Sequence, residues 1–222
     1  MSERTQSSIP FVGLHAHSGT GSPFDGLGYP GEHMDFAYQN GNDALALTDH
    51  GNMNGFAYQV QHAQKMMKQG KDFKPIFGVE AYFLPSIEEW REELERVKED
   101  KKAKKSIDKS ASGTTIENEE NKREVKNILN RRRHLILLAQ NQKGLNNIFS
   151  LVSKSYREEN FYRFPRIDYA MLKEHNEGVI AASACLGGVY AGNFWENREE
   201  GEEAVLNAMR ETTRNMVDIF GD

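Results

Sequence analysis

The segment Ala44-Leu45-Ala46-Leu47-Thr48 runs directly into Asp49-His50-Gly51-Asn52. A short apolar run of this length is typical of a buried strand, and the imidazole that follows it is the commonest metal ligand among side chains. Ile76-Phe77-Gly78-Val79 runs into Glu80 in the same way. In parallel sheets and barrels, active sites gather where the strands end and the loops begin. The sequence therefore predicts functional side chains at one edge of a sheet.

Apolar runs of this kind recur along the chain, with helical patterns between them. The strand candidates are residues 11–14, 44–48, 76–79, 135–139 and 178–182. Strands that alternate with helices predict β/α units around a mostly parallel sheet, and hence an α/β fold. A chain of 222 residues is long enough for one large α/β domain, which is the organisation we expect.

The composition excludes several classes of protein. Lys and Arg number 28 against 33 Asp and Glu, so the net charge of -5 provides no global basic field for nucleic acid, although bound divalent cations can themselves attract phosphate. Cys185 is the only cysteine, which excludes an internal disulfide and favours a reducing, cytoplasmic location. Residues 1–10 lack the apolar region of a secretory signal, and no apolar run of about 20 residues could cross a bilayer, so no membrane partner is expected.

The composition changes sharply in residues 86–130, which carry twelve acidic and eleven basic side chains. Trp90, Leu94 and Val97 follow helical spacing, which predicts a helix with one narrow apolar stripe. Residues 106–115 contain Ser, Asp, Gly and Thr and are expected to form a flexible turn. We interpret 86–130 as a charged helical or partly disordered insertion, either a solvated surface or an arm that docks on a partner.

Two histidines, His15 and His17, follow the first strand candidate. Residues two apart in an extended chain point the same way, so the two imidazoles can bind one ion or two neighbouring ions. The pair alone is weak evidence, because unrelated loop histidines show the same spacing. Asp25 lies in the next loop, whereas His134 precedes a strand candidate instead of following one, which a purely parallel arrangement does not explain.

The candidate ligands share chemistry suited to a metal cluster. They are His15, His17, Asp25, His50, Glu80, His134 and Cys185. Histidine, carboxylate and thiolate together suit Zn, Mn or Fe, with Mg as a further candidate. Seven ligands exceed what one tetrahedral ion needs, which predicts two or three divalent ions and, from their chemistry, phosphoester hydrolysis. On the residues alone, Asp25 could equally be a loop aspartate and Cys185 a small buried hydrophobe.

Six segments agree in order with one family. They are residues 13–18, 44–53, 74–82, 134–139, 161–168 and 177–188. On these segments the chain resembles the PHP (polymerase and histidinol phosphatase) domain at the N-terminus of bacterial-type DNA polymerase III alpha subunits. The first two segments fit the whole PHP superfamily, including small-molecule phosphatases. Residues 161–168 and the Ser-Ala-Cys-Leu-Gly-Gly run at 183–188 resemble the polymerase branch, in which cysteine stands where the phosphatases often have histidine.

The resemblance implies a fold for the whole of residues 1–222. That fold is a distorted TIM-like barrel of about seven β/α units. An Asp-x-His pair near the end of the family pattern is not found in this chain. We therefore expect a barrel that is incomplete at its C-terminal side, either the N-terminal piece of a longer polymerase or a shortened or split form.

The resemblance also implies roles for individual residues. The seven candidate ligands would hold the metals, and Asp49 would be a catalytic residue that orients an imidazole. Apart from the resemblance, the run Arg131-Arg132-Arg133 just before His134 is interpreted either as a contact for nucleic-acid phosphates or as a solvated charge run. The remaining histidines are assigned to helices or helix ends. They are His33, His62 and His175.

The implied activity is that of a metal-dependent 3′ to 5′ exonuclease that proofreads a DNA primer-template. Its partners would be DNA and the rest of the polymerase chain or other replisome subunits. Two alternatives are a free-standing PHP phosphatase acting on a small phosphate monoester, and a catalytically silent domain that only stabilises the polymerase or binds a proofreading subunit.

Overall fold

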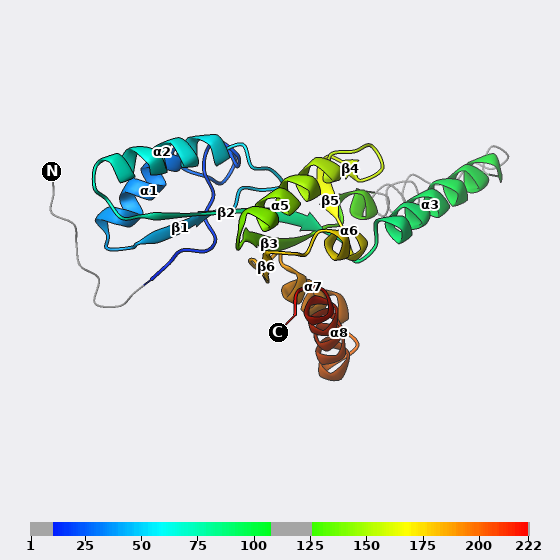
Figure 1. Cartoon of the computed structure of the whole chain (residues 1–222). Helices are drawn as coiled ribbons and strands as arrows, with labels where there is room; N and C mark the ends of the chain where they lie inside the picture. The colour runs from blue at the N-terminus through cyan, green and yellow to red at the C-terminus, as the bar shows by residue number, and fades with distance from the viewer. Residues whose placement is uncertain (1–10, 108–125, 222) are drawn as a thin grey trace.

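The computed structural model describes residues 11–107 and 126–221 (Figure 1). Six strands form one mixed sheet, and they are β1 (Ala44–Leu47), β2 (Lys74–Phe83), β3 (Arg133–Ala139), β4 (Phe161–Tyr162), β5 (Phe164–Ile167) and β6 (Val179–Ala182). The order across the sheet is β4-β5-β2-β3-β6, and β1 also pairs with β2. The predicted α/β fold is confirmed. Within the described residues the strands form a path with two ends and do not close into a ring.

Most of the sheet runs in one direction, as the sequence predicts, but β3 does not. β1 and β5 pair in parallel with β2, and β6 shares that direction because β6 and β2 are both antiparallel to β3. β4 is antiparallel to β5. The register pairs His134 with Tyr82, so the start of β3 lies beside the end of β2. The reversed strand explains why His134, which lies at the start of β3, reaches the same edge of the sheet as His50, which follows β1.

One predicted strand is absent, and one hairpin was not predicted. Residues 11–14 form no strand and contribute only a single bridge between Gly13 and Leu45, while Phe11 and Leu14 are exposed. The segment is apolar, but it lies at the surface and so lacks a second layer to cover it. The hairpin of β4 and β5 escapes prediction because it is short and contains Pro165, and proline is uncommon inside strands.

Helices cover the sheet in two separate groups (Figure 1). α1 (Pro30–Gln39) and α2 (Phe56–Lys68) pack around β1 and bury a small apolar cluster that includes Met34, Leu47 and Met66. α5 (Gln142–Ser155) covers β2 and β3 over the main core, where Val79, Leu137, Ile148 and Leu151 are fully or almost fully buried. The main core includes Val79, Ala81 and Phe83 of β2, while the smaller cluster surrounds β1, which pairs with residues 74–77 of β2.

The C-terminal part of the described chain is helical. α6 (Tyr169–Glu174) begins at Asp168, whose side chain accepts a hydrogen bond from the amide of Met171. α7 (Val189–Asn197) and α8 (Glu202–Phe220) form a hairpin beside the sheet (Figure 1). No helix of the described residues has the length and apolarity needed to cross a membrane.

α3 (Ile87–Ile107) extends away from the body of the molecule (Figure 1). Its apolar stripe packs with the short helical segment at residues 126–130, and the indole Nε1 of Trp90 donates a hydrogen bond of 2.7 Å to the carbonyl of Ile128. The expected turn at 106–115 falls largely on residues 108–125, which lie outside the described part of the chain. The interpretation of 86–130 as an insertion stays a prediction.

Arg166 joins the base of α3 to the β4–β5 hairpin. Its side chain is fully buried, and its guanidinium lies 4.4 Å from the centre of the Trp90 ring. The guanidinium donates hydrogen bonds to four backbone carbonyls, those of Leu129, Arg131, Tyr162 and Phe164. Burial lowers the pKa of Arg166 to about 10, so the group remains charged at neutral pH. This one side chain therefore ties the backbone of residues 129–131 to that of residues 162–164.

We expect Arg166→Met to lower the free energy of unfolding by about 3 kcal/mol, because the substitution leaves buried carbonyls without donors. Chemical denaturation of the purified chain measures the change. Arg163→Met is the matched control, since Arg163 is exposed and should cost less than about 0.5 kcal/mol. Equal stability of the two variants would contradict this role for Arg166.

Candidate metal centre

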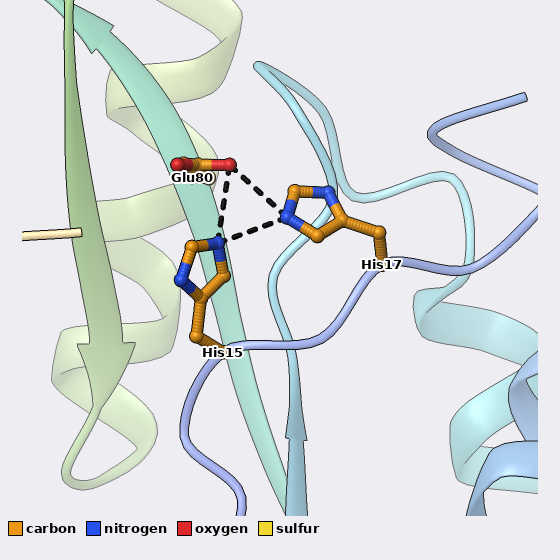
Figure 2. Close-up of side chains that lie close together, drawn as sticks. All are labelled: His15, His17 and Glu80. Carbon is orange, nitrogen blue, oxygen red and sulfur yellow. Dashed lines mark hydrogen bonds and ion pairs between the residues drawn. The ribbon is translucent and has the colours of Figure 1, made fainter. Parts of the chain in front are cut away.

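The carboxylate of Glu80 lies at the centre of the predicted cluster. Glu80 is on β2 and is fully buried. Its Oε2 lies 3.3 Å from His15 Nε2 and 3.1 Å from His17 Nε2. Figure 2 shows these two imidazoles turned from one loop toward the carboxylate. The same oxygen lies 2.9 Å from His50 Nδ1, and Oε1 lies 3.0 Å from His134 Nδ1. Four imidazoles therefore surround one buried carboxylate.

Two further predicted ligands extend the cluster on either side. Asp25 Oδ2 lies 2.7 Å from His50 Nε2. Cys185 Sγ lies 3.4 Å from His134 Nδ1 and 3.5 Å from Glu80 Oε1. Cys185 is exposed, so the alternative of a buried apolar cysteine is wrong. The structure thus brings all seven predicted ligands together, while their role as ligands stays a prediction.

Backbone pairing sets the positions of the cluster residues. His50 follows β1 and bridges in parallel to Glu80, with the amide of Glu80 donating to the carbonyl of Asp49 and the amide of Gly51 donating to that of Glu80. The amide of His134 donates to the carbonyl of Gly187, which ties the Cys185 loop to the start of β3. Each candidate ligand is therefore attached to the sheet or to a loop bonded to the sheet.

Asp49 is bonded to two serines of the loop that follows His17. Its buried carboxylate accepts hydrogen bonds from the amide and hydroxyl of Ser18, both at 2.7 Å, and from the hydroxyl of Ser22 at 3.0 Å. The link from Asp49 to His17 Nδ1 passes through Ser22 Oγ, which lies 3.2 Å from that nitrogen, and the expectation that Asp49 orients an imidazole stays a prediction. Asp49 also holds the loop that carries His17 and Asp25.

The same loop has two positions at which a side chain would clash with neighbouring atoms. A Cβ on Gly21 would lie 2.4 Å from Asp49 Oδ2, and one on Gly26 would lie 2.4 Å from the carbonyl oxygen of Ser18. Neither distance is compatible with a side chain unless the loop moves. The glycine-rich sequence after His17 therefore allows the loop to fold tightly over Asp49.

Two buried atoms in the cluster indicate that the residues fit a metal ion. Glu80 Oε2 and His50 Nδ1 lie 2.9 Å apart, yet neither makes a hydrogen bond within the described chain. A buried polar atom without a partner is costly, whereas an ion placed among convergent donor atoms would satisfy it. Three groups have donor atoms within 4.8 Å of one another, and they are His15, His17 and Glu80; His17, Asp25 and His50; and His50, Glu80 and His134. Imidazole and carboxylate donors of this kind suit Zn, Mn or Fe.

Glu80 and His50 each stabilise the charged form of the other. Burial alone would raise the pKa of Glu80, but contacts with His134, His17 and His50 outweigh it and hold the pKa well below its ordinary range. Burial alone would lower the pKa of His50, but the carboxylates of Glu80 and Asp25 outweigh it and raise the pKa. Without metal, the cluster therefore favours an ionised Glu80 and a protonated His50.

The three predicted phosphate-binding arginines have different surroundings. Arg131 makes a bidentate ion pair with Glu93, and Arg133 pairs with Glu196, so the structure does not bring these two guanidinium groups to the cluster. Arg132 lies instead over the rings of Tyr82 and Phe164.

The three remaining histidines lie outside the cluster, as the sequence predicts. His33 bonds to the carbonyl of Leu27, His62 pairs with Asp35 at 3.0 Å, and His175 ends α6.

Sequence reasoning missed three residues that position the cluster. Ser18 and Ser22 carry the bonds to Asp49 described above. The Tyr82 ring lies parallel to the His50 ring, with centroids 5.8 Å apart and an interplanar angle of 1°. A signal for Tyr82 was present, because residues two apart on a strand face the same side and Tyr82 follows Glu80 by two. The serines gave no signal beyond their place after His17.

A family model of the PHP domain matches residues 13–222. The chain belongs to the PHP domain family. Among its relatives, the DNA polymerase III subunit alpha of Aquifex aeolicus is 34% identical over 216 residues, which cover 97% of this chain and 15% of the relative. The corresponding subunit of Deinococcus radiodurans is 33% identical over 179 residues, covering 81% of this chain and 10% of the relative. This PHP chain therefore spans only a small part of the length of the relatives it matches.

Two solved structures have a low similarity to this PHP domain. An amidohydrolase from Chromobacterium violaceum is 17% identical and has a TM-score of 0.37, with 93% of this chain and 49% of that chain covered. A two-domain protein from Bacteroides vulgatus, described as containing a predicted PHP-like metal-dependent phosphoesterase, is 23% identical with a TM-score of 0.29, covering 39% of this chain and 28% of that one.

We expect Glu80→Gln to weaken metal binding by more than about a hundredfold, because the change removes the charge that contacts all four imidazoles. Even residues that only support a metal ligand typically change metal affinity by about 10- to 100-fold. Elemental analysis after dialysis, together with titration of Mn or Zn, measures the effect. Glu177→Gln is the matched control at an exposed position and should bind like the parent chain. Unchanged binding by Glu80→Gln would contradict the assignment.

The raised pKa of His50 predicts opposite pH dependence with and without metal. Metal needs a neutral imidazole, so affinity should begin to fall on acidification at a pH above the 6.5 of an ordinary histidine. Without metal, protonated His50 stabilises the fold, so the free energy of unfolding should decrease as the pH rises through the raised pKa. Metal titration and denaturation in EDTA across pH 5–9 measure both trends. His50→Gln should flatten them, and a parent chain with no such trends would refute the assignment.

Proposed function

We propose that this PHP domain is a metal-dependent phosphodiesterase that hydrolyses the 3′-terminal phosphodiester of DNA, as the N-terminal part of a DNA polymerase III alpha-type protein. The observation that carries the proposal is the convergence of four imidazoles on one buried carboxylate, with Glu80 Oε2 left without a hydrogen bond. Structural ion pairs have no need for so many imidazoles at one point.

The residues that would hold the ions are the seven predicted ligands. Divalent ions bound there would activate water at neutral pH and stabilise the attacking and leaving oxygens of a phosphodiester. The chain's own carboxylates set the orientation of the imidazoles. His50 lies between Asp25 at Nε2 and Glu80 at Nδ1, so its ring is directed from both sides. The Ser22 hydroxyl bonds to His17 Nδ1 and so orients the His17 ring.

The access to the cluster supports a large substrate. Asp25 is about half exposed, and Phe24 and Leu27 on either side of it are highly exposed. Leu186, beside Cys185, is also exposed. A site rimmed by exposed side chains admits the end of a polymer, whereas sites for small molecules usually enclose most of the ligand.

The relatives support the polymerase context. They are named DNA polymerase III subunit alpha, and the match covers nearly the whole of this chain in the Aquifex aeolicus protein. The expected partners are therefore a DNA primer-template and the rest of a polymerase chain or other replisome subunits. The order of the cluster residues along the chain is compatible with this role, because all seven predicted ligands are present.

The chain loaded with Mn or Zn should shorten a 5′-labelled single-stranded oligonucleotide one nucleotide at a time from its 3′ end. His15→Ala should lower the rate at least about a hundredfold, because the group of His15, His17 and Glu80 loses one of its three ligands. Denaturing gel electrophoresis follows the products. His33→Ala is the matched control outside the cluster.

Two other outcomes would replace the proposal. Hydrolysis of a chromogenic phosphate monoester without attack on DNA ends would identify a small-molecule phosphatase. Metal binding without hydrolysis of either substrate would identify a structural domain.

A further inference from the structure

Arg132 differs from its two neighbours in having no carboxylate partner among the described residues. Arg131 is engaged by Glu93 and Arg133 by Glu196, whereas the one hydrogen bond that the Arg132 guanidinium makes within residues 11–107 and 126–221 runs from Nη1 to the carbonyl of Asn130 at 2.9 Å. Its Nε is buried without a partner. Arg132 therefore carries a positive charge that the described chain leaves uncompensated.

The guanidinium lies on an aromatic surface that leads to the metal centre. It lies 3.7 Å from the centre of the Phe164 ring and 5.4 Å from that of Tyr82. Tyr82 in turn lies parallel to His50, and its ring centre is 5.4 Å from that of His134. We call Arg132, Tyr82 and Phe164 the shelf. One ring therefore separates the free charge from two candidate metal ligands.

The sheet places the shelf on the same face as the cluster. β5 pairs in parallel with β2, with Arg166 beside Tyr82, so Phe164 lies level with Glu80. Tyr82 follows Glu80 by two residues, and Arg132 precedes His134 by two. Side chains two apart share a face, so the shelf and the cluster lie on one surface of the sheet.

Arg166 donates hydrogen bonds to the backbone on both sides of the shelf. Its Nε donates to the carbonyl of Arg131, next to Arg132, and its Nη1 donates to the carbonyl of Phe164. The shelf is thus fixed before any ligand arrives, which reduces the ordering cost of binding. A guanidinium with free donors fits phosphate oxygens in both charge and geometry.

We propose that Arg132, supported by Tyr82 and Phe164, binds a phosphate of the substrate strand next to the bond that is cleaved. The assignment rests on the proposed function and identifies the substrate as a chain of nucleotides with a phosphate beyond the reacting one. Arg131 and Arg133 have no such role, because their charges are neutralised within the protein.

Binding of a fluorescent single-stranded oligonucleotide to the full chain in EDTA tests the proposal without hydrolysis. Arg132→Gln should weaken binding about tenfold at low salt and reduce the slope of log affinity against log salt by about 1. Arg132→Lys should recover part of the affinity. Arg163→Gln is the matched control, because it removes the same charge from an exposed guanidinium that lies over the Tyr162 ring, 5.7 Å from its centre. Thermal unfolding confirms that the variants are folded.

Competition for the oligonucleotide-binding site distinguishes a nucleotide strand from free phosphate as the ligand of Arg132. A strand of several nucleotides should compete strongly, whereas inorganic phosphate and a mononucleotide should compete weakly and with equal effect on the parent and Arg132→Gln chains. Equal competition by inorganic phosphate at the Arg132 site would overturn the assignment to a strand.

Two results of the binding measurement would also overturn the role of Arg132. One is an oligonucleotide affinity of Arg132→Gln equal to that of the parent chain, and the other is an equal loss of affinity in Arg132→Gln and Arg163→Gln. Strand binding that depends on Arg132 in a chain without hydrolytic activity would support the shelf while refuting the proposed function.

Discussion

The buried carboxylate of Glu80 is the constraint on which the functional part of this molecule depends. A fully buried charge is stable only when polar partners surround it, and the described chain supplies four imidazoles from three separate regions of sequence. The first loop, the end of β1 and the start of β3 must all reach the same point of β2. The requirement explains why the loop after His17 is tight and why Asp49 and its serines are buried.

Placing four imidazoles around one carboxylate requires a reversed strand. Had β3 run parallel to β2, His134 would lie at the opposite edge of the sheet from His50. The antiparallel pairing puts the start of β3 beside the end of β2, and the return through β6 then brings Cys185 to the same edge. The reversed strand thus lets ligands from both ends of strands meet in one cluster.

A second set of interactions lies beside the cluster and depends on Arg166. This buried guanidinium connects Trp90 at the base of α3, the segment before β3 and the β4–β5 hairpin. The charged α3 region is therefore joined to the candidate site through specific backbone bonds, although α3 itself extends away from the body (Figure 1). Residues 161–168, which resemble the polymerase branch, owe part of their pattern to this packing, because Phe164, Arg166 and Asp168 each have a separate structural role.

The sequence by itself determined the α/β class, the four strands β1, β2, β3 and β6, and the identity of the residues that gather in the cluster, because apolar runs that end in histidine or carboxylate are visible without a structure. It did not determine the direction of β3, since strand direction depends on pairing between distant segments and leaves no local pattern. It also missed Ser18 and Ser22, which bond to Asp49, and treated three consecutive arginines alike. Only the tertiary structure separated them, because Glu93 and Glu196, which neutralise Arg131 and Arg133, lie far away in sequence and reach them through packing of α3 and α7.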